Sequence, residues 1–281
     1  MIIEKAHAKI NLGLDILGKR KDGFHDLDTI MQTVDLHDLV LLKKTPSGIT
    51  VRSDSGDIPL DGKNLGYQAA YEFFAYTGIR NGVEMEMIKN IPVEAGLAGG
   101  SSDAAAVIRG LDSLFETGLS MEEKEKLGLL IGSDVPFCMA GKTQRATGRG
   151  EVLKKLPGWE GLPLVIVRPL ENVQTGWAFS LYDPAQIKER PDMDALEEIV
   201  RHRRKECLAS RLVNVFEEVV FPHKGMIKKA KYDMMKTRPL ACSMTGSGAC
   251  VFAIYASKEE AAIAWSGMKK EGYESFLTQT R

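Results

Sequence analysis

The sequence predicts an α+β fold in two lobes, and three observations support this class. Segments with strand-like alternation and segments with helical periodicity follow one another without a regular order, which favours α+β over a doubly wound parallel sheet. The 281 residues are enough for about two domains of ordinary size. The proline- and glycine-rich stretch 157–163 is the best candidate boundary, so we expect an N-terminal lobe at 1–156 and a C-terminal lobe at 157–281.

The chain begins with expected strands and turns. β-branched and apolar residues dominate 2–17, the polar stretch 18–25 contains an Asp-Gly turn signal, and 27–42 alternates again. Pro, Ser, Asp and Gly are frequent in 46–62, which predicts turns around a short strand.

A helix is expected after Asn64, which is a cap-type residue, because apolar residues recur at helical spacing to about Thr77. Its expected apolar face consists of Leu65, Ala69, Phe73 and Tyr76. The remaining elements of the first lobe are a strand at 83–88, helices at 102–115 and 121–131, and short strands at 137–147 and 152–156.

The second lobe is expected to open with a buried strand, because PLVIVRP at 163–169 is a short, continuous apolar run. The expected helices lie near 174–182, 193–205, 209–220, 224–236 and 257–270. The other expected strands lie near 240–244, 249–255 and 273–278.

Composition excludes several classes of protein. Lys and Arg number 37 and Asp and Glu number 38, so the formal net charge is −1, without the basic excess of a nucleic-acid binder. No apolar run approaches the ~18 residues of a membrane span. The four cysteines lack the C-x-x-C spacing of a zinc site, and the N-terminus lacks the apolar region of a signal peptide. We therefore expect a soluble cytoplasmic protein with a small-molecule substrate and no nucleic-acid or membrane partner. The oligomeric state that we expect is a monomer or weak homodimer, on which composition gives no information.

The glycine-rich stretch 92–106, PVEAGLAGGSSDAAA, is the most informative part of the sequence. It lies between an expected strand and an expected helix, and Gly96, Gly99 and Gly100 let the backbone turn its N–H groups toward one point. A helix N-terminus carries about +0.5 charge and unpaired N–H donors, which suit a phosphate. A serine-capped turn without a ligand is the alternative, and the strand–loop–helix context favours phosphate.

Other glycine motifs give weaker signals. TGSGA at 245–249 could bring backbone N–H groups and Ser247 near the same ligand, although a tight strand connection explains it as well. ATGRGE at 146–151 is expected to be a hairpin turn without chemistry. GKT at 141–143 lacks the preceding glycine of a Walker A loop, and GLAGGS is not the Rossmann pattern G-x-G-x-x-G.

Two charged residues have contexts that suit catalysis. Lys9 lies in the apolar run AKINL, where position alone favours an outward side chain over one held for electrostatic work. Asn11 is expected on the same face of the strand as Lys9. Asp134 is either a turn or cap residue or an active carboxylate, and His25 either contacts a polar ligand or is a surface or packed residue.

Six segments together resemble the GHMP kinase superfamily, which is named for galactokinase and for homoserine, mevalonate and phosphomevalonate kinases. They occur in family order through most of the chain, whereas 183–240 matches poorly. The segments are 8–36, 63–70, 91–111, 131–138, 146–151 and 245–253. Within the superfamily, the combination of AKINL with DGFH is most similar to members that phosphorylate a cytidine-bearing alcohol.

The resemblance implies a two-lobed α+β kinase with its active site in the inter-lobe cleft and an ATP-binding N-terminal lobe. It implies transfer of phosphate from ATP, with Mg²⁺, to the 2-hydroxyl of 4-diphosphocytidyl-2-C-methyl-D-erythritol in non-mevalonate isoprenoid synthesis. Lys9 and Asp134 fall on the family's catalytic lysine and aspartate, and Asp134 would accept the hydroxyl proton while Lys9 keeps it ionised. The residues on ATP-binding positions are Asn64, Lys89, Pro92, Val93, Glu94, Ala95, Gly96, Leu97, Ala98, Gly99, Gly100, Ser101 and Ser102. The residues on substrate-binding positions are Asn11, Phe24, His25, Met31, Thr175 and Phe179.

The chain departs from the family pattern at three places. The family usually has proline at the position of His7, glycine at Ala98 and tyrosine at Phe24. A phenylalanine can stack on a pyrimidine but lacks the hydroxyl. For Mg²⁺ the sequence identifies no carboxylate ligand, and Ser102 is the candidate.

Two other functions remain open. The chain could be a kinase for another small alcohol, such as homoserine or a mevalonate derivative, or a non-catalytic metabolite sensor on the same fold. Retention of both Lys9 and Asp134 argues against the sensor. The basic cluster RHRRK at 201–205 is the one sign of a nucleic-acid or partner-binding module, and a solvated helix face explains it better.

Overall fold

The structure is a computed structural model that describes residues 1–183 and 185–281. These residues form two compact units, which we call unit 1 and unit 2 and describe one at a time. Unit 1 contains Met1–Ala8, Leu36–Val93 and Ala98–Gly141, and unit 2 contains Lys9–Asp35, Glu94–Leu97 and Lys142–Arg281. The lobe boundary at 156/157 stays a prediction. The two units do not coincide with the two expected lobes, because 9–35 and 142–156 belong to unit 2.

The elements mix strands and helices in the way expected for an α+β chain. The strands are β1 (Ile2–Lys19), β2 (His25–Thr45), β3 (Ile49–Ser53), β4 (Gly82–Ile88), β5 (Thr143–Gly148), β6 (Val152–Lys155), β7 (Pro163–Arg168), β8 (Ala241–Met244), β9 (Val251–Ile254) and β10 (Glu274–Gln279). The helices are α1 (Leu65–Thr77), α2 (Gly99–Phe115), α3 (Met121–Ile131), α4 (Val135–Ala140), α5 (Thr175–Tyr182), α6 (Met193–Arg201), the 3₁₀ helix η1 (Lys205–Ser210), α7 (Phe216–Val220), α8 (Gly225–Lys236) and α9 (Lys258–Lys270).

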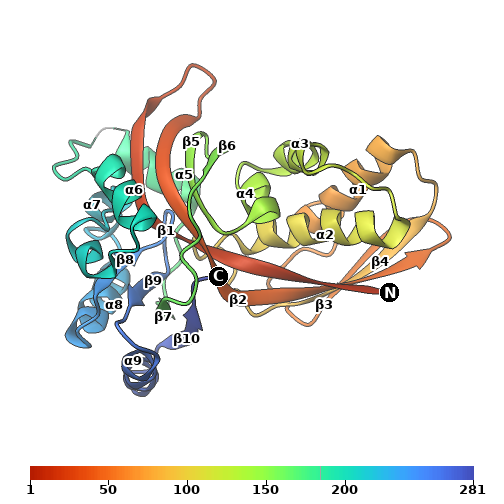
Figure 1. Ribbon diagram of the computed structural model, residues 1–281. Helices are drawn as coiled ribbons and strands as arrows, with labels where there is room; N and C mark the ends of the chain where they lie inside the picture. Colours follow the sequence, from red (N-terminus) through yellow and green to blue (C-terminus); the bar gives the residue numbers. More distant parts are fainter. Residues whose placement is uncertain (184) are drawn as a thin grey trace. The chain divides into compact units, whose positions relative to one another are not determined.

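In unit 1, helices α1 to α4 lie on one side of strands β3, β4 and the second half of β2 (Figure 1). Strand β4 runs antiparallel to β2 and parallel to β3. Its apolar residues alternate with glutamates, so Val83, Met85 and Met87 are buried while Glu86 is exposed. These side chains and Phe73 of α1 belong to one apolar core.

Local capping signals set the ends of the unit 1 helices. The Asn64 side chain accepts hydrogen bonds from Gly66 N at 2.8 Å and Tyr67 N at 3.3 Å, and Gly78 ends α1 with a φ of 70°. The expected helix from Asn64 to Thr77 is therefore confirmed. Ser120 and Glu123 cap α3 reciprocally, which confirms the helix expected at 121–131.

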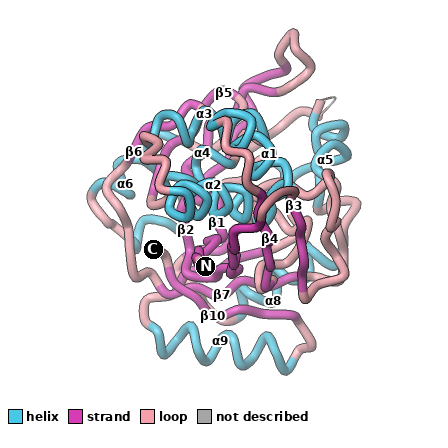
Figure 2. Tube along the Cα trace, turned by 90° about the vertical axis from the view of Figure 1, so that its right-hand side faces the viewer, coloured by secondary structure: helices cyan, strands magenta, loops and turns pink. Residues whose placement is uncertain are grey.

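Unit 2 is built on an antiparallel sheet in the order β10–β7–β9–β8. The predicted buried strand is confirmed as β7, and only its last residue, Arg168, is partly exposed. Helix α9 lies along β7 and β10 (Figure 2), and Trp265 Nε1 donates to Ser275 O at 3.0 Å. The first half of β2 pairs with β5, and β5 forms a hairpin with β6, as expected for 146–151.

Four expectations about local structure are wrong. The helix expected near 193–205 ends at Arg201, and 202–204 form a turn and loop. The start of the strand expected at 137–147 is wrong, because 137–140 belong to helix α4, where Pro136 falls in the first turn and its missing N–H costs nothing. The stretch 211–215 is not helical, because its backbone bonds to Leu14 of β1: Leu14 N donates to Val213 O at 3.0 Å. Tyr76 is exposed rather than part of the apolar face of α1, since its hydroxyl donates to Glu123 Oε1 at 2.8 Å.

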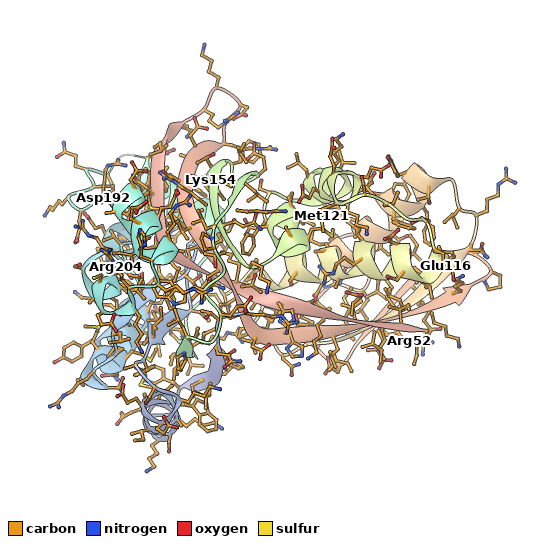
Figure 3. The ribbon with its side chains drawn as sticks, in the orientation of Figure 1. Arg52, Glu116, Met121, Lys154, Asp192 and Arg204 are labelled. Carbon is orange, nitrogen blue, oxygen red and sulfur yellow. The ribbon has the colours of Figure 1, made fainter. Side chains whose placement is uncertain are left out.

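The basic cluster 201–205 is largely solvent-exposed, as expected for a solvated face. Helix α6 ends at Arg201, which pairs with Glu197, and Arg204, labelled in Figure 3, is exposed in the segment that follows the helix. Among the described helices, none combines the length and apolar character needed to cross a membrane.

Candidate active site

The glycine-rich loop after β4 has an unusual alternation of backbone conformation. Glu94, Gly96 and Ala98 have positive φ angles of 53°, 77° and 58°, and the residues between them do not. Alternating backbone handedness turns successive N–H groups toward one side and forms an anion-binding nest. The loop predicted to hold phosphate therefore has a backbone suited to that task.

The loop leads directly into α2, whose first turn is built from glycine and serine. None of the described side chains caps this helix end, so its first N–H groups are not occupied by a side-chain acceptor. A Cβ at Gly99 would lie 3.1 Å from Ile91 Cγ2, and one at Gly100 would lie 3.3 Å from Leu65 Cδ1. These glycines let the helix start close to its neighbours and leave its dipole available to an anion.

Lys9 is buried, with 4% of its surface exposed, so the outward orientation favoured by its position is wrong. Its Nζ donates to Asn11 Oδ1 at 2.8 Å and to Gly96 O at 3.0 Å. Lys9 N also donates to Leu97 O at 3.1 Å. Backbone and side chain of one lysine thus hold the glycine loop on β1, and the expectation that Asn11 shares its face is confirmed.

Asn11 joins three segments of unit 2 through its side chain. Besides Lys9, Oδ1 accepts from Gly246 N at 2.9 Å. The Thr245 hydroxyl has two acceptors within reach of its one proton, Asn11 Oδ1 at 3.2 Å and Gly96 O at 3.1 Å. Its Nδ2 donates to Thr29 Oγ1 at 2.9 Å, and that hydroxyl donates to Gly13 O at 2.6 Å. A satisfied buried network of this kind fixes geometry, and sequence reasoning missed Thr29 and Thr245.

The second glycine cluster packs against the first within unit 2. A Cβ on Gly96 would lie 2.2 Å from Thr245 O, and Cys250 N donates to Ala95 O at 3.1 Å. The stretch 245–249 is a strand connection between β8 and β9, as one interpretation of its sequence held. It also lies beside the segment 94–97 and beside Lys9, as the other interpretation requires.

Lys89 forms a buried ion cluster in unit 1. Its Nζ contacts Asp38 Oδ2 at 2.5 Å and Asp103 Oδ2, and all three side chains are almost fully buried. Burial lowers the pKa of Lys89, but the carboxylates of Asp103 and Asp38 outweigh it and raise that pKa above its ordinary value. Burial also raises the pKa of Asp103 to about 7, and its Oδ1 has no hydrogen-bond partner among the described atoms.

Two predicted nucleotide contacts therefore already have structural tasks. The side chain of Asn64 caps α1 and donates to Pro59 O at 2.8 Å, and the ammonium of Lys89 is ion-paired. Their contact with a nucleotide stays a prediction. Sequence reasoning found neither Asp38 nor the ion-paired state of Lys89, because the three charges come from separate elements without a local signal.

Asp134 takes the position before the first residue of α4 in unit 1. Its carbonyl accepts the Cys138 N–H at 3.0 Å, whereas its half-buried side chain makes no capping bond among the described residues. The carboxylate is thus held at a helix N-terminus without being used as its cap. Asp134 belongs to unit 1 and Lys9 to unit 2, so each is described within its own unit.

Unit 2 groups the aromatic residues predicted for the substrate. The rings of His25 and Phe179 stack at a centroid distance of 4.4 Å. Phe24 is 52% exposed, and the Arg149 guanidinium lies 4.8 Å from its ring centroid. Arg149 lies in the hairpin turn to which the sequence assigned no chemistry.

Met31 and Thr175 differ in accessibility. Met31 is 1% exposed, so it lines the interior beneath any ligand-accessible surface. Thr175 is exposed at the start of α5 and shares a 3.1 Å hydrogen bond with Ser247 Oγ. That bond links α5 to the second glycine cluster.

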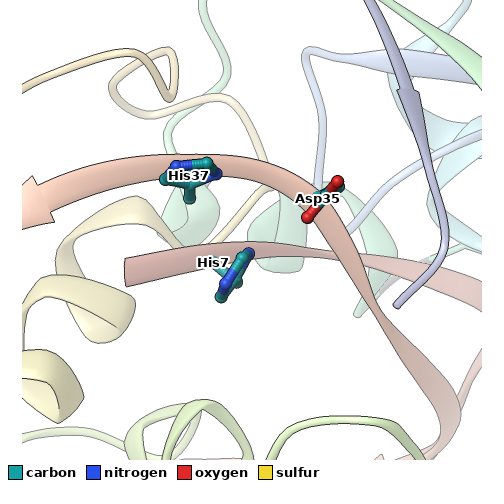
Figure 4. Close-up of side chains that lie close together, drawn as sticks. All are labelled: His7, Asp35 and His37. Atoms are coloured by element: carbon teal, nitrogen blue, oxygen red, sulfur yellow. The ribbon is translucent and has the colours of Figure 1, made fainter. Parts of the chain in front are cut away.

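The departures at His7 and Ala98 have structural consequences in unit 1. Ala98 takes a φ of 58°, a region in which glycine is favoured. The rings of His7 and His37 lie 5.0 Å apart and are tilted by 51° (Figure 4). Ser102 Oγ donates to His7 O at 2.6 Å, which ties the start of α2 to β1.

Known proteins are similar to this chain over nearly its whole length. The model of the GHMP kinases N terminal domain matches residues 64–142, and that of the GHMP kinases C terminal matches residues 189–274. The 4-diphosphocytidyl-2-C-methyl-D-erythritol kinase of Acetivibrio thermocellus is 41% identical over 276 residues, which cover 98% of either chain. The kinase of the same name from Caldicellulosiruptor saccharolyticus is 42% identical over 280 residues, covering 99% of this chain and 97% of the relative.

Solved structures share the architecture. A crystal structure of 4-(cytidine 5'-diphospho)-2C-methyl-D-erythritol kinase superposes with a TM-score of 0.86 at 27% identity and covers 99% of both chains. The mevalonate kinase of Methanococcus jannaschii superposes with a TM-score of 0.78 at 15% identity, covering 100% of this chain and 98% of that one, and shows the fold alone. The predicted α+β class is confirmed.

Proposed function

The chain belongs to the GHMP kinase family, and on that premise we propose that it phosphorylates the 2-hydroxyl of 4-diphosphocytidyl-2-C-methyl-D-erythritol with ATP. The curated relatives that match it from end to end carry the name of that kinase. The observation that carries the proposal is the loop at 94–98, whose alternating φ angles lead into the uncapped start of α2.

The triphosphate of ATP is held mainly by backbone. The N–H groups of 94–98 and of the first turn of α2 supply donors, and the helix dipole adds partial positive charge. Binding through the backbone explains how a chain with a net charge of −1 can take a polyanion.

Catalysis in this proposal depends on two side chains. The substrate hydroxyl attacks the γ-phosphorus in line, and Asp134 accepts its proton, a contribution of ~10²–10⁴ in rate. Lys9 stabilises the negative charge of the transferring phosphoryl group, and its bond to Gly96 O keeps it beside the phosphate loop.

Magnesium is the metal that phosphoryl transfer implies, and the oxygens present fit it. Ser102 donates its proton to His7 O, so its oxygen keeps lone pairs for a hard cation. When bound, Mg²⁺ would neutralise charge on the phosphate oxygens. Ser102, together with nucleotide oxygens, is the protein ligand we propose.

The acceptor alcohol binds in unit 2 in this proposal. Phe24 and Phe179 offer aromatic faces for a pyrimidine, and His25 offers a polar edge beside them. Asn11 and Thr175 supply polar contacts to the rest of the substrate, and Met31 supports the pocket from beneath. Four free cysteines suit a reducing cytoplasm, which is the location we propose, with the protein acting as a monomer or weak dimer on a small molecule.

The test of this function is an ADP-release assay over several alcohols. We expect turnover with the cytidyl substrate and none with homoserine or mevalonate. Turnover of only an acceptor without cytidine would overturn the substrate, and ATP binding without turnover of any alcohol would favour a metabolite sensor.

A variant tests the proposed base. Asp134→Ala should lower kcat by at least ~10²-fold, because proton acceptance is lost, while ATP affinity stays near that of the wild type. Steady-state kinetics and calorimetry measure the two quantities. Turnover at the wild-type rate would contradict the assignment.

A further inference from the structure

Asp183 links two elements of unit 2 through both of its carboxylate oxygens. It follows the last residue of α5, its Oδ1 lies 2.6 Å from His25 Nε2, and its Oδ2 pairs with Lys19 Nζ. The hydrogen bonds from Lys19 and His25 lower the pKa of Asp183 below its ordinary value. The carboxylate is therefore an acceptor, and a carboxylate that accepts at Nε2 requires the proton on that nitrogen.

The imidazole of His25 is held on its face as well as on its edge. The ring of Phe179 stacks on it at 4.4 Å with an interplanar angle of 16°. Phe179 and Asp183 are four residues apart, so one helical turn presents both contacts. Stacking fixes the plane of the ring, and the carboxylate fixes which nitrogen points toward α5.

We propose that Asp183 is a positioning residue that fixes the tautomer of His25 and so makes the substrate site select cytosine over uracil. This inference rests on the proposed function, because it concerns the pyrimidine end of the same substrate. With the ring neutral, the proton on Nε2 leaves Nδ1 as an acceptor.

The two pyrimidines differ at the position that such an acceptor distinguishes. Cytosine carries an exocyclic amino group, which donates, where uracil carries a carbonyl oxygen, which accepts. An acceptor on His25 gains a hydrogen bond from the first and faces an unpaired lone pair on the second. Sites that leave a polar group unpaired reject the wrong ligand strongly.

Calorimetric titration with CDP and with UDP, at about pH 8, measures the selectivity without turnover. We expect the wild type to prefer CDP, and Asp183→Asn to reduce the CDP-to-UDP affinity ratio by about tenfold or more, because an amide can donate to His25 and release its tautomer. Lys19→Gln is the matched control, since it removes the other partner of Asp183 and keeps the bond to His25. It should retain the wild-type ratio.

Two further measurements separate this role from a merely structural one. Nitrogen-15 spectra of the wild type should show His25 protonated at Nε2 and not at Nδ1. In a His25→Ala background, Asp183→Asn should leave the CDP-to-UDP ratio unchanged, because the ring it orients is gone.

The proposal is overturned if His25 is protonated at Nδ1 alone. It is also overturned if Asp183→Asn weakens both nucleotides equally, or if Lys19→Gln lowers the ratio as much as Asp183→Asn does. A failure of the proposed kinase function gives a different result. In that case the wild type does not phosphorylate the cytidyl substrate, whatever the tautomer of His25 and the CDP-to-UDP affinity ratio are.

Discussion

Two lysines are buried, one in each unit, and their surroundings differ. Lys9 of unit 2 donates to two neutral oxygens, Asn11 Oδ1 and the carbonyl of Gly96. Lys89 of unit 1, with 5% of its side chain exposed, is ion-paired with Asp38 and Asp103. The sequence resemblance placed both lysines at the active site. Comparing their contacts distinguishes a lysine that holds a loop from one that is part of a buried ion cluster.

The contacts of the two lysines indicate that Lys89 has a structural role and that Lys9 has a role in the proposed phosphate site. Around Lys89 one ammonium and two carboxylates neutralise most of each other's charge, and Asp38 also accepts the N–H groups of Asn90 and Ile91. Such a cluster holds β2, the end of β4 and α2 together. Lys9 instead binds the loop that we propose holds phosphate, which places its ammonium beside that loop.

Removing Lys89 should have the largest effect, and the effect should be on stability. Lys89→Met leaves two buried carboxylates without their cation, and breaking a buried pair in this way costs about 3–5 kcal/mol. Urea unfolding followed by circular dichroism measures the loss. A variant of wild-type stability with a weakened ATP affinity would instead favour the predicted nucleotide contact.

The same cluster predicts a pH dependence of stability. Burial raises the pKa of Asp103 from 3.8 to about 7, so the folded state binds a proton that the unfolded state has lost. Its contribution to stability is therefore complete below about pH 4 and disappears as the pH rises through about 7, by at most about 4 kcal/mol. We expect the stability difference between wild type and Asp103→Asn to fall over this range.

Asp112 on the same helix is the control for that measurement. Despite burial, hydrogen bonds from Lys124 and Thr117 lower its pKa, so its contribution is present above its unfolded pKa and is lost only as the pH falls through the folded value. Between pH 4.5 and 8 the difference between wild type and Asp112→Asn should stay level. A parallel decline in both differences would contradict the role of Asp103.

Lys9→Met, the same substitution in the other lysine, should affect rate more than stability. The oxygens that Lys9 contacts keep other donors: Gly246 N remains on Asn11 Oδ1, and Thr245 Oγ1 remains on Gly96 O. We therefore expect a loss of about 1–2 kcal/mol in stability and a fall in kcat of about 10²–10³-fold. Unfolding and ADP release measure both, and the comparison fails if Lys9→Met unfolds the protein while Lys89→Met only slows it.

Much of the fold follows from local sequence, because local bonds determine it. Asn64 caps α1 through residues two and three positions away, and the alternation in 83–88 sorts the faces of β4. The non-helical stretch 211–215 could not be predicted, because its backbone partner is Leu14, some 200 residues earlier in the chain. Local apolar periodicity gives no information about such a partner.

The candidate site also contains features that local sequence predicts and features that it does not. The glycines at 96, 99 and 100 predict, from local sequence alone, a loop that binds its ligand through backbone N–H groups. The burial of Lys9 depends on Gly96, and the orientation of His25 depends on Asp183, which are distant in sequence. Residue types without a local motif, such as Asp38 and Thr245, gain their roles only when distant elements meet.

The smallest expected effect concerns the loop that Lys9 holds. Ala98 has a φ of 58°, where glycine lacks the steric penalty of a Cβ, so Ala98→Gly should stabilise the protein by about 1 kcal/mol. Glu116→Gly, at the other end of α2 with a φ of 55°, is the matched control and should give a similar gain in urea unfolding. Because Lys9 and Thr245 still fix Gly96, the KM for ATP should not change in Ala98→Gly. If Glu116→Gly stabilises the protein and Ala98→Gly does not, the surrounding loop determines the backbone conformation at residue 98. Lys9 would then be one of several contacts that hold the loop.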